Sequence, residues 1–161
     1  ATDLACLHSF DDDNFVLSIH SYQPNDFTFN FVPHLSYPFS YNGTYWNQDA
    51  LKKMLLGYEK IARRRAVPIF VGEFGVNYRQ GLYGEDRWLK DMLHCFKDFG
   101  FHWAYWTYKA VKNSIFPDGI YSYMENPQWV NRHGPLLGWD TYSLYWTKRR
   151  NNIKKLFVST P

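Results

Sequence analysis

The sequence has 161 residues, of which 45% are hydrophobic and 20% aromatic, and a formal net charge of +3. This length allows one domain with a buried core, and no apolar run approaches the ~20 residues that a membrane-spanning helix needs. The small basic excess lies mainly in predicted helices, where cations complement the helix dipole, and does not predict a nucleic-acid surface. Two cysteines, Cys6 and Cys95, are too few for a disulfide framework or a zinc site, so we expect no metal or cofactor.

In chain order, segments with strand-type patterns alternate with amphipathic helical segments. We expect strands at residues 14–20, 67–74 and 101–108, followed by helices at 47–65, 84–100 and 143–158 respectively. Asn47 is placed to cap the first helix, and Gly100 to end the second. This alternation is typical of a parallel α/β sheet, here in a single domain over residues 1–161.

An aromatic segment at residues 25–46 separates the first strand from the first helix. It contains the glycosylation sequon Asn42-Gly43-Thr44 and the neighbouring rings Tyr45 and Trp46. Tyrosine and tryptophan side chains are apolar on their faces and polar at one tip, which suits wet clefts as well as cores.

Candidate functional residues follow the ends of the predicted strands. His20, Glu73 and Trp106 stand near the carboxyl ends of the three strands, where parallel sheets and barrels build their sites. Glu73 stands out because it ends an apolar run, and an ionised carboxylate in an apolar interior costs several kcal/mol unless it is paired. It is therefore either exposed at the strand end or held there for chemistry.

Three strands do not close a barrel. A complete (β/α)₈ barrel takes ~250 residues, so this chain holds only part of one. We expect its inner sheet face, with Val16, Ile69 and Val71, and its strand edges to favour association.

Three motifs in order then resemble one enzyme family. "LACLHSFDDDNFVLSIHSYQPNDFT", "VPIFVGEFGV" and "FHWAYWTYK" are similar to strands six, seven and eight of family 5 glycoside hydrolases, the cellulase family. The resemblance implies a partial domain that runs from barrel strand six to helix eight. It also implies a retaining endo-β-glycanase that acts on β-glucans or related plant polysaccharides outside the cell. No signal peptide is visible, so we expect any targeting segment to have been removed or to lie upstream.

The resemblance also assigns roles to individual residues. Glu73 corresponds to the catalytic nucleophile, His20 and Tyr22 to substrate-binding residues that steady it, and Trp106 to a platform for the sugar. A purely structural role remains the alternative for each of them. Trp103 is the better candidate for a core ring, and Tyr105 is left unassigned.

The family's acid/base glutamate has no counterpart here. It belongs to an Asn-Glu-Pro segment after strand four, which this sequence lacks. Glu59 and Glu85 fall on predicted helices, and Glu125 follows the last strand, so none replaces it by descent. A retaining glycosidase needs a second carboxyl group ~5 Å from the nucleophile.

Two classes of function therefore stay open. The chain either supplies the nucleophile half of a β-glycanase, or it is a non-hydrolytic carbohydrate-binding or assembly fragment. The expected partners are a β-glucan and either the missing amino-terminal half of the barrel or a second copy of the chain. Which polysaccharide it takes is not decided by the residues, although the aromatic segment at 25–46 is expected to shape that choice.

Overall fold

The structure is a computed structural model. It describes residues 14–76 except 30 and 33, residues 82–106, the isolated residues 6 and 12, and two short strands, Lys109–Ala110 and Tyr121–Ser122. The helix predicted at 143–158 and Glu125 lie outside the described residues.

The main sheet is parallel and three-stranded. Its strands are β1 (Leu17–His20), β4 (Ile69–Phe74) and β5 (His102–Tyr105), in the spatial order β1-β4-β5. Both β1 and β5 pair with β4 in parallel, so β4 is the central strand. The predicted strands are therefore all present, although each is shorter than expected.

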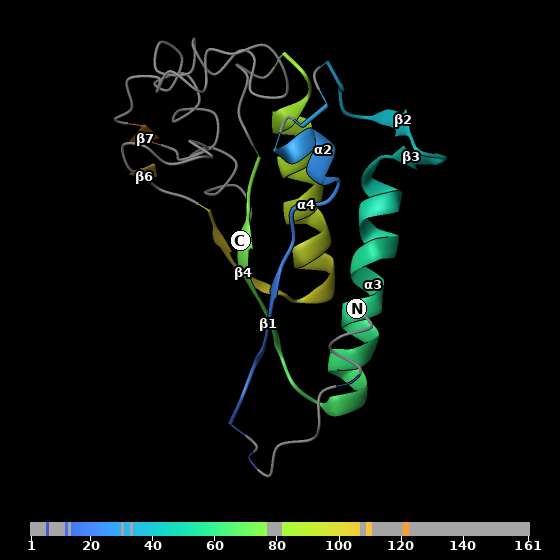
Figure 1. The fold of residues 1–161 in the computed structure, drawn as a ribbon. Coiled ribbons are helices and arrows are strands. Elements are labelled where there is room, and N and C mark those ends of the chain that lie inside the picture. The colour runs from blue at the N-terminus through green and yellow to red at the C-terminus, as the bar shows by residue number, and fades with distance from the viewer. Residues whose placement is uncertain are drawn as a thin grey trace.

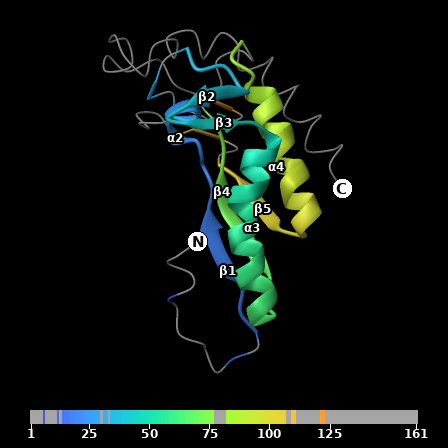
Figure 2. The ribbon, with the colours of Figure 1, turned by 90° about the vertical axis from the view of Figure 1, so that its right-hand side faces the viewer.

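Two long helices lie on the same side of this sheet. They are α3 (Gln48–Arg65) and α4 (Glu85–Phe99), and Figures 1 and 2 both show them side by side along the strands. The core lies between the helices and the sheet. It contains fully buried side chains from both helices and from β4: Leu51, Leu55, Trp88, Met92, Phe96, Val71 and Phe74. None of the helices in the described part of the chain is long and apolar enough to cross a membrane.

Local sequence explains where α3 begins and ends. The Asn47 side chain accepts a hydrogen bond from the Ala50 N–H at 3.0 Å, so the predicted N-cap is confirmed. Three arginines occupy the last turn, where the carbonyl end of the helix dipole attracts cations. Ala66 then closes the helix in the left-handed conformation, with φ of 54°.

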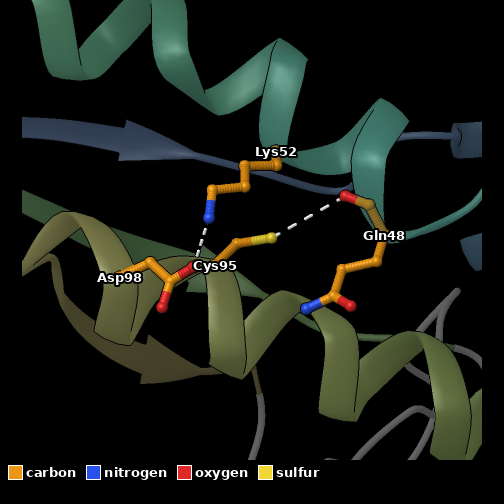
Figure 3. Close-up of polar contacts among 4 residues, drawn as sticks. All are labelled: Gln48, Lys52, Cys95 and Asp98. Carbon is orange, nitrogen blue, oxygen red and sulfur yellow. Dashed lines mark hydrogen bonds and ion pairs between the residues drawn. The ribbon is translucent and has the colours of Figure 1, made fainter.

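An ion pair and a thiol contact join the two helices. Lys52 on α3 forms an ion pair with Asp98 on α4, and the Cys95 thiol on α4 lies 3.9 Å from the backbone oxygen of Gln48 on α3 (Figure 3). Burial raises the pKa of the Cys95 thiol to about 12. Cys95 therefore stays protonated at neutral pH and packs as a small hydrophobic residue, whereas Cys6 is exposed.

The expectation for the inner sheet face is wrong in part. Ile69 and Val71 are almost completely buried because they point toward the helices, together with Leu17 on β1. The opposite face carries the alternate residues, among them the exposed Ser18. Val16 is exposed as expected, but the uncovered face is more polar than the sequence suggested.

The segment at 25–46 has more structure than the sequence analysis assigned to it. It forms a short helix, α2 (Asn25–Thr28), and an antiparallel hairpin of β2 (Phe39–Tyr41) and β3 (Thr44–Trp46). Asn42 and Gly43 form the two-residue turn with φ of 47° and 74°. Asn-Gly is the dipeptide that such hairpin turns prefer, so this signal was present in the sequence.

The left-handed end of α3 gives a stability test. We expect Ala66→Gly to raise the free energy of unfolding by about 1 kcal/mol, because glycine adopts positive φ without the steric cost that a Cβ brings. Ala62→Gly, in the last turn of the same helix, is the control and should lower it by about 1 kcal/mol. Urea denaturation of both variants measures the difference. Equal effects of the two substitutions would contradict the assignment of strain to Ala66.

A candidate active site at the carboxyl ends of the strands

A β-bulge in β4 determines where Glu73 points. The pairing of β1 with β4 runs regularly to Ile19 opposite Val71 and then shifts, so that His20 lies opposite Glu73. On the other side, Val71 pairs with Trp103 and Phe74 with Tyr105, which again leaves one extra residue in β4. Strict alternation would have placed Glu73 on the helix side with Val71. The bulge instead places it opposite His20, at the end of the strand.

Gly72 supplies the space for this bulge. A Cβ added at this position would lie 2.9 Å from the Ser18 Oγ atom and 3.7 Å from the His20 ring. A side chain here would therefore press on the neighbouring strand and on the imidazole. Glycine in a strand often marks such a close approach.

Two side chains converge on one oxygen of Glu73. The Tyr22 hydroxyl donates to Oε2 at 3.0 Å, and Nδ1 of His20 lies 3.3 Å from the same oxygen. The Glu73 side chain is 28% exposed, so the carboxylate is half-buried yet open to solvent. Within the described part of the chain, no donor contacts its other oxygen, Oε1. One oxygen of the carboxylate is thus held in place by two contacts.

Phe74 fixes the strand directly after Glu73. Its ring is fully buried and makes edge-on contacts with Phe96, Trp103 and Tyr105, with centroid distances of 4.9, 5.5 and 5.5 Å. Edge-to-face pairs at this separation are attractive. The backbone at Glu73 is therefore fixed, because the next residue, Phe74, is packed into the core.

A backbone hydrogen bond holds Trp106 at the same end of the sheet. Its N–H donates to the Phe74 oxygen at 2.8 Å, and its side chain is exposed. Among the described residues, no ring contact or hydrogen bond joins its indole to His20, Tyr22 or Glu73. The structure therefore brings three of the four predicted site residues into contact and places the fourth at the same strand ends.

Sequence reasoning missed the residues that support Tyr22. The Thr28 hydroxyl donates to the Tyr22 carbonyl oxygen at 2.5 Å, and the Trp88 indole N–H donates to the Gln23 carbonyl oxygen at 3.2 Å. Both fix the backbone on which Tyr22 stands. Trp88 lies within the helix predicted at 84–100, and no sequence pattern indicates where its N–H points.

The other glutamates in the described ranges have different roles. Glu85 is buried at the start of α4 and accepts a hydrogen bond from the Tyr83 N–H at 2.9 Å. Glu59 forms an ion pair with Arg63 at 2.6 Å within α3. Neither is a second acid beside Glu73. No group of three or more potential metal ligands occurs among the described residues.

The fold and this site define the chain as part of a (β/α)₈ barrel, with a carboxylate at the carboxyl end of the central strand β4. Residues 4–112 match the family Cellulase (glycosyl hydrolase family 5), which is more than half of the chain. The chain belongs to this family. A comparison with curated proteins found no match.

Solved structures support the fold. An endoglucanase is 23% identical, with a TM-score of 0.57 over 89% of this chain and 43% of its own. A hyperthermophilic endo-β-1,4-glucanase, solved with substrate, is 24% identical, with a TM-score of 0.57 over 81% of this chain and 40% of its own. Cellulose synthase subunit Z from Clostridioides difficile is 29% identical, with a TM-score of 0.53 over 87% of this chain and 42% of its own. The chain thus spans about two fifths of the length of the structures it matches.

The aromatic contacts of Phe74 predict a large effect of truncation. We expect Phe74→Ala to lower the free energy of unfolding by about 3–5 kcal/mol, because it leaves a cavity among three rings. Phe74→Leu keeps most of the apolar volume and should cost less. Denaturant titrations of both variants provide the measurement. A loss below ~1 kcal/mol for Phe74→Ala would show that the ring does not hold this strand.

Proposed function

We propose that the chain supplies the nucleophile side of a retaining endo-β-glycanase, with Glu73 as the attacking carboxylate. The observation that carries this proposal is the pair of contacts from Tyr22 and His20 to one oxygen of Glu73. An attacking carboxylate must stay ionised and correctly oriented, and hydrogen bonds to its charged form favour both. The oxygen without a donor among the described residues is then the one that attacks.

The reaction follows from these positions. Oε1 of Glu73 attacks the anomeric carbon, the glycosidic bond breaks, and a glycosyl-enzyme ester forms; water later hydrolyses that ester. Tyr22 and His20 stabilise the carboxylate before attack and again when it is released. His20 donates only when Nδ1 carries the proton, so this role needs that tautomer or the protonated ring.

We assign the substrate class from the exposed aromatic side chains and from membership of the family. A family 5 chain with exposed aromatic side chains near its strand ends suits β-linked glucans or related plant polysaccharides, which present apolar ring faces. Trp106, exposed at the end of β5, is the proposed platform for the sugar at the cleavage point. Such polymers lie outside cells, so we propose an extracellular location.

The acid that protonates the leaving group comes from elsewhere in this proposal. Glu59 and Glu85 are engaged away from Glu73, and the matched structures are more than twice as long as this chain. Without that acid, the alternative is a non-hydrolytic carbohydrate-binding or assembly fragment that uses the same residues. Hydrolysis that depends on Glu73 would identify the β-glycanase. Binding without such hydrolysis would identify the binding or assembly fragment.

The first test replaces the proposed nucleophile. Glu73→Gln keeps the shape of the side chain but cannot attack. When the chain is paired with an amino-terminal barrel half that brings the acid, turnover of a soluble β-glucan should therefore fall by a factor on the order of 10³ or more. Binding of cello-oligosaccharides should survive. Glu59→Gln, the same change on α3, is the matched control and should leave turnover unchanged. Measurable turnover that is equal in the paired Glu73→Gln variant and in the paired unaltered chain would remove Glu73 from the mechanism.

The second test addresses the partner. Strands β1 and β5 are the edges of the sheet formed by the described residues, and exposed strand edges attract further strands. We therefore propose that the chain pairs with the amino-terminal half of a barrel or with a second copy of itself. Because the uncovered face is partly polar, the edges and Val16 contribute more to this pairing than Ile69 or Val71.

Light scattering over a concentration series should show a mass above that of the monomer. Val16→Lys places a charge directly before the exposed edge strand and should shift the series toward the monomer. A monomer at all concentrations would contradict the pairing. Efficient hydrolysis by the chain alone would mean that its acid is present in this sequence, and Glu125 would be the first residue to substitute.

A further inference from the structure

A row of three aromatic rings leads from Glu73 toward solvent. The Tyr22 ring, whose hydroxyl contacts Glu73, lies 4.9 Å from the Phe29 ring, and Phe29 lies 5.4 Å from Phe31. Exposure increases along the row, because Tyr22 and Phe29 are half-buried whereas Phe31 is 42% exposed. We call Tyr22, Phe29 and Phe31 the aromatic row.

The backbone that carries this row is firmly anchored. Phe27, two residues before Phe29, is fully buried, and its ring lies 5.6 Å from Phe39 and 6.0 Å from Tyr37. The Thr28 hydroxyl bonds back to the Tyr22 carbonyl oxygen. After Phe31, the Val32 N–H donates to the backbone carbonyl oxygen of Asp26 at 3.1 Å, so the segment folds back on α2.

This anchoring matters for binding. A ring that is already held in position loses little conformational entropy when a ligand stacks on it. A single exposed phenylalanine is common on protein surfaces and needs no function. Phe31 differs because it is the most exposed of three rings in contact with one another, the first of which contacts the proposed nucleophile.

We propose that Phe31 is a stacking platform for a sugar unit of a β-linked glycan chain beyond the unit attacked by Glu73. The apolar C–H face of a pyranose ring fits a flat aromatic face, and the row links this platform to the site through Phe29. The inference rests on the proposed function, and it adds a subsite that discriminates by chain length. Short oligosaccharides do not reach Phe31, whereas longer ones gain its contact.

The test compares oligosaccharides of increasing length. Calorimetric titration of the 161-residue chain with cellobiose through cellohexaose should show affinity that rises with length and then levels off. Phe31→Ala should weaken binding of cellohexaose roughly threefold to tenfold, the effect of losing one aromatic contact, and should leave the shortest ligand that binds unaffected. Phe31→Leu keeps an apolar side chain without a flat face and should behave like Phe31→Ala. Phe31→Trp should retain the affinity.

Tyr45→Ala is the matched control. Tyr45 is 56% exposed on β3 and makes no ring contact with the aromatic row among the described residues, so its removal should not change the dependence on length. Circular dichroism and thermal unfolding check that each variant folds like the parent chain.

The outcomes separate this inference from the proposed function. Equal affinities of Phe31→Ala and the parent chain for every length would overturn the platform, even if hydrolysis still depends on Glu73. Uniform weakening at all lengths would also overturn it, because it would mean that Phe31 only supports Tyr22. No binding of any oligosaccharide to the parent chain would overturn both the platform and the proposed function.

Discussion

The extra residue in β4 is the constraint on which the site depends. Side chains alternate along a strand, and the residues before Gly72 follow that rule, with Ile69 and Val71 packed against the helices. An uninterrupted strand would direct Glu73 into the same apolar layer, where an unpaired carboxylate would cost several kcal/mol. The bulge moves Glu73 opposite His20, and Phe74 then returns to the core between three rings. The fold thus keeps a buried strand and still presents a carboxylate at its end.

The donors around Glu73 belong to a different strand and its following segment. His20 ends β1, and Tyr22 lies in the segment between β1 and α2, where Thr28 and Trp88 hold the backbone. Core packing and site geometry are therefore linked, because the same α4 residue that fills the core also bonds to the segment beside the site. Membership of the cellulase family agrees with this arrangement, while the roles of the individual residues are proposals that the experiments above address.

Local patterns predicted the two long helices α3 and α4, and their order among the strands, well. The first helix begins one residue after the predicted cap, and Gly100 ends the second as expected, because caps and amphipathic faces are local properties. The bulge was not predictable in this way, since register depends on what the neighbouring strands present. Residues 67–71 are all apolar, so the sequence shows no alternation between the two faces of the strand. For this reason Ile69 and Val71 were assigned to the wrong face. The hairpin turn at Asn42 and Gly43, by contrast, has a local sequence signal, because Asn-Gly favours the positive φ angles of such turns.

The central position of β4 has a consequence for how the site opens. Amide protons in a strand paired on both sides exchange with solvent only through larger unfolding events, whereas those of edge strands also exchange through local opening. Glu73 stands on the doubly paired strand, and His20 on an edge strand of the described sheet. Fraying of β1 would therefore remove the histidine, and the tyrosine that follows it, from a carboxylate that stays in place. The proposed nucleophile and the side chains that contact it thus lie on strands with unequal protection from hydrogen exchange. The contacts at Glu73 can therefore break transiently while the core stays folded.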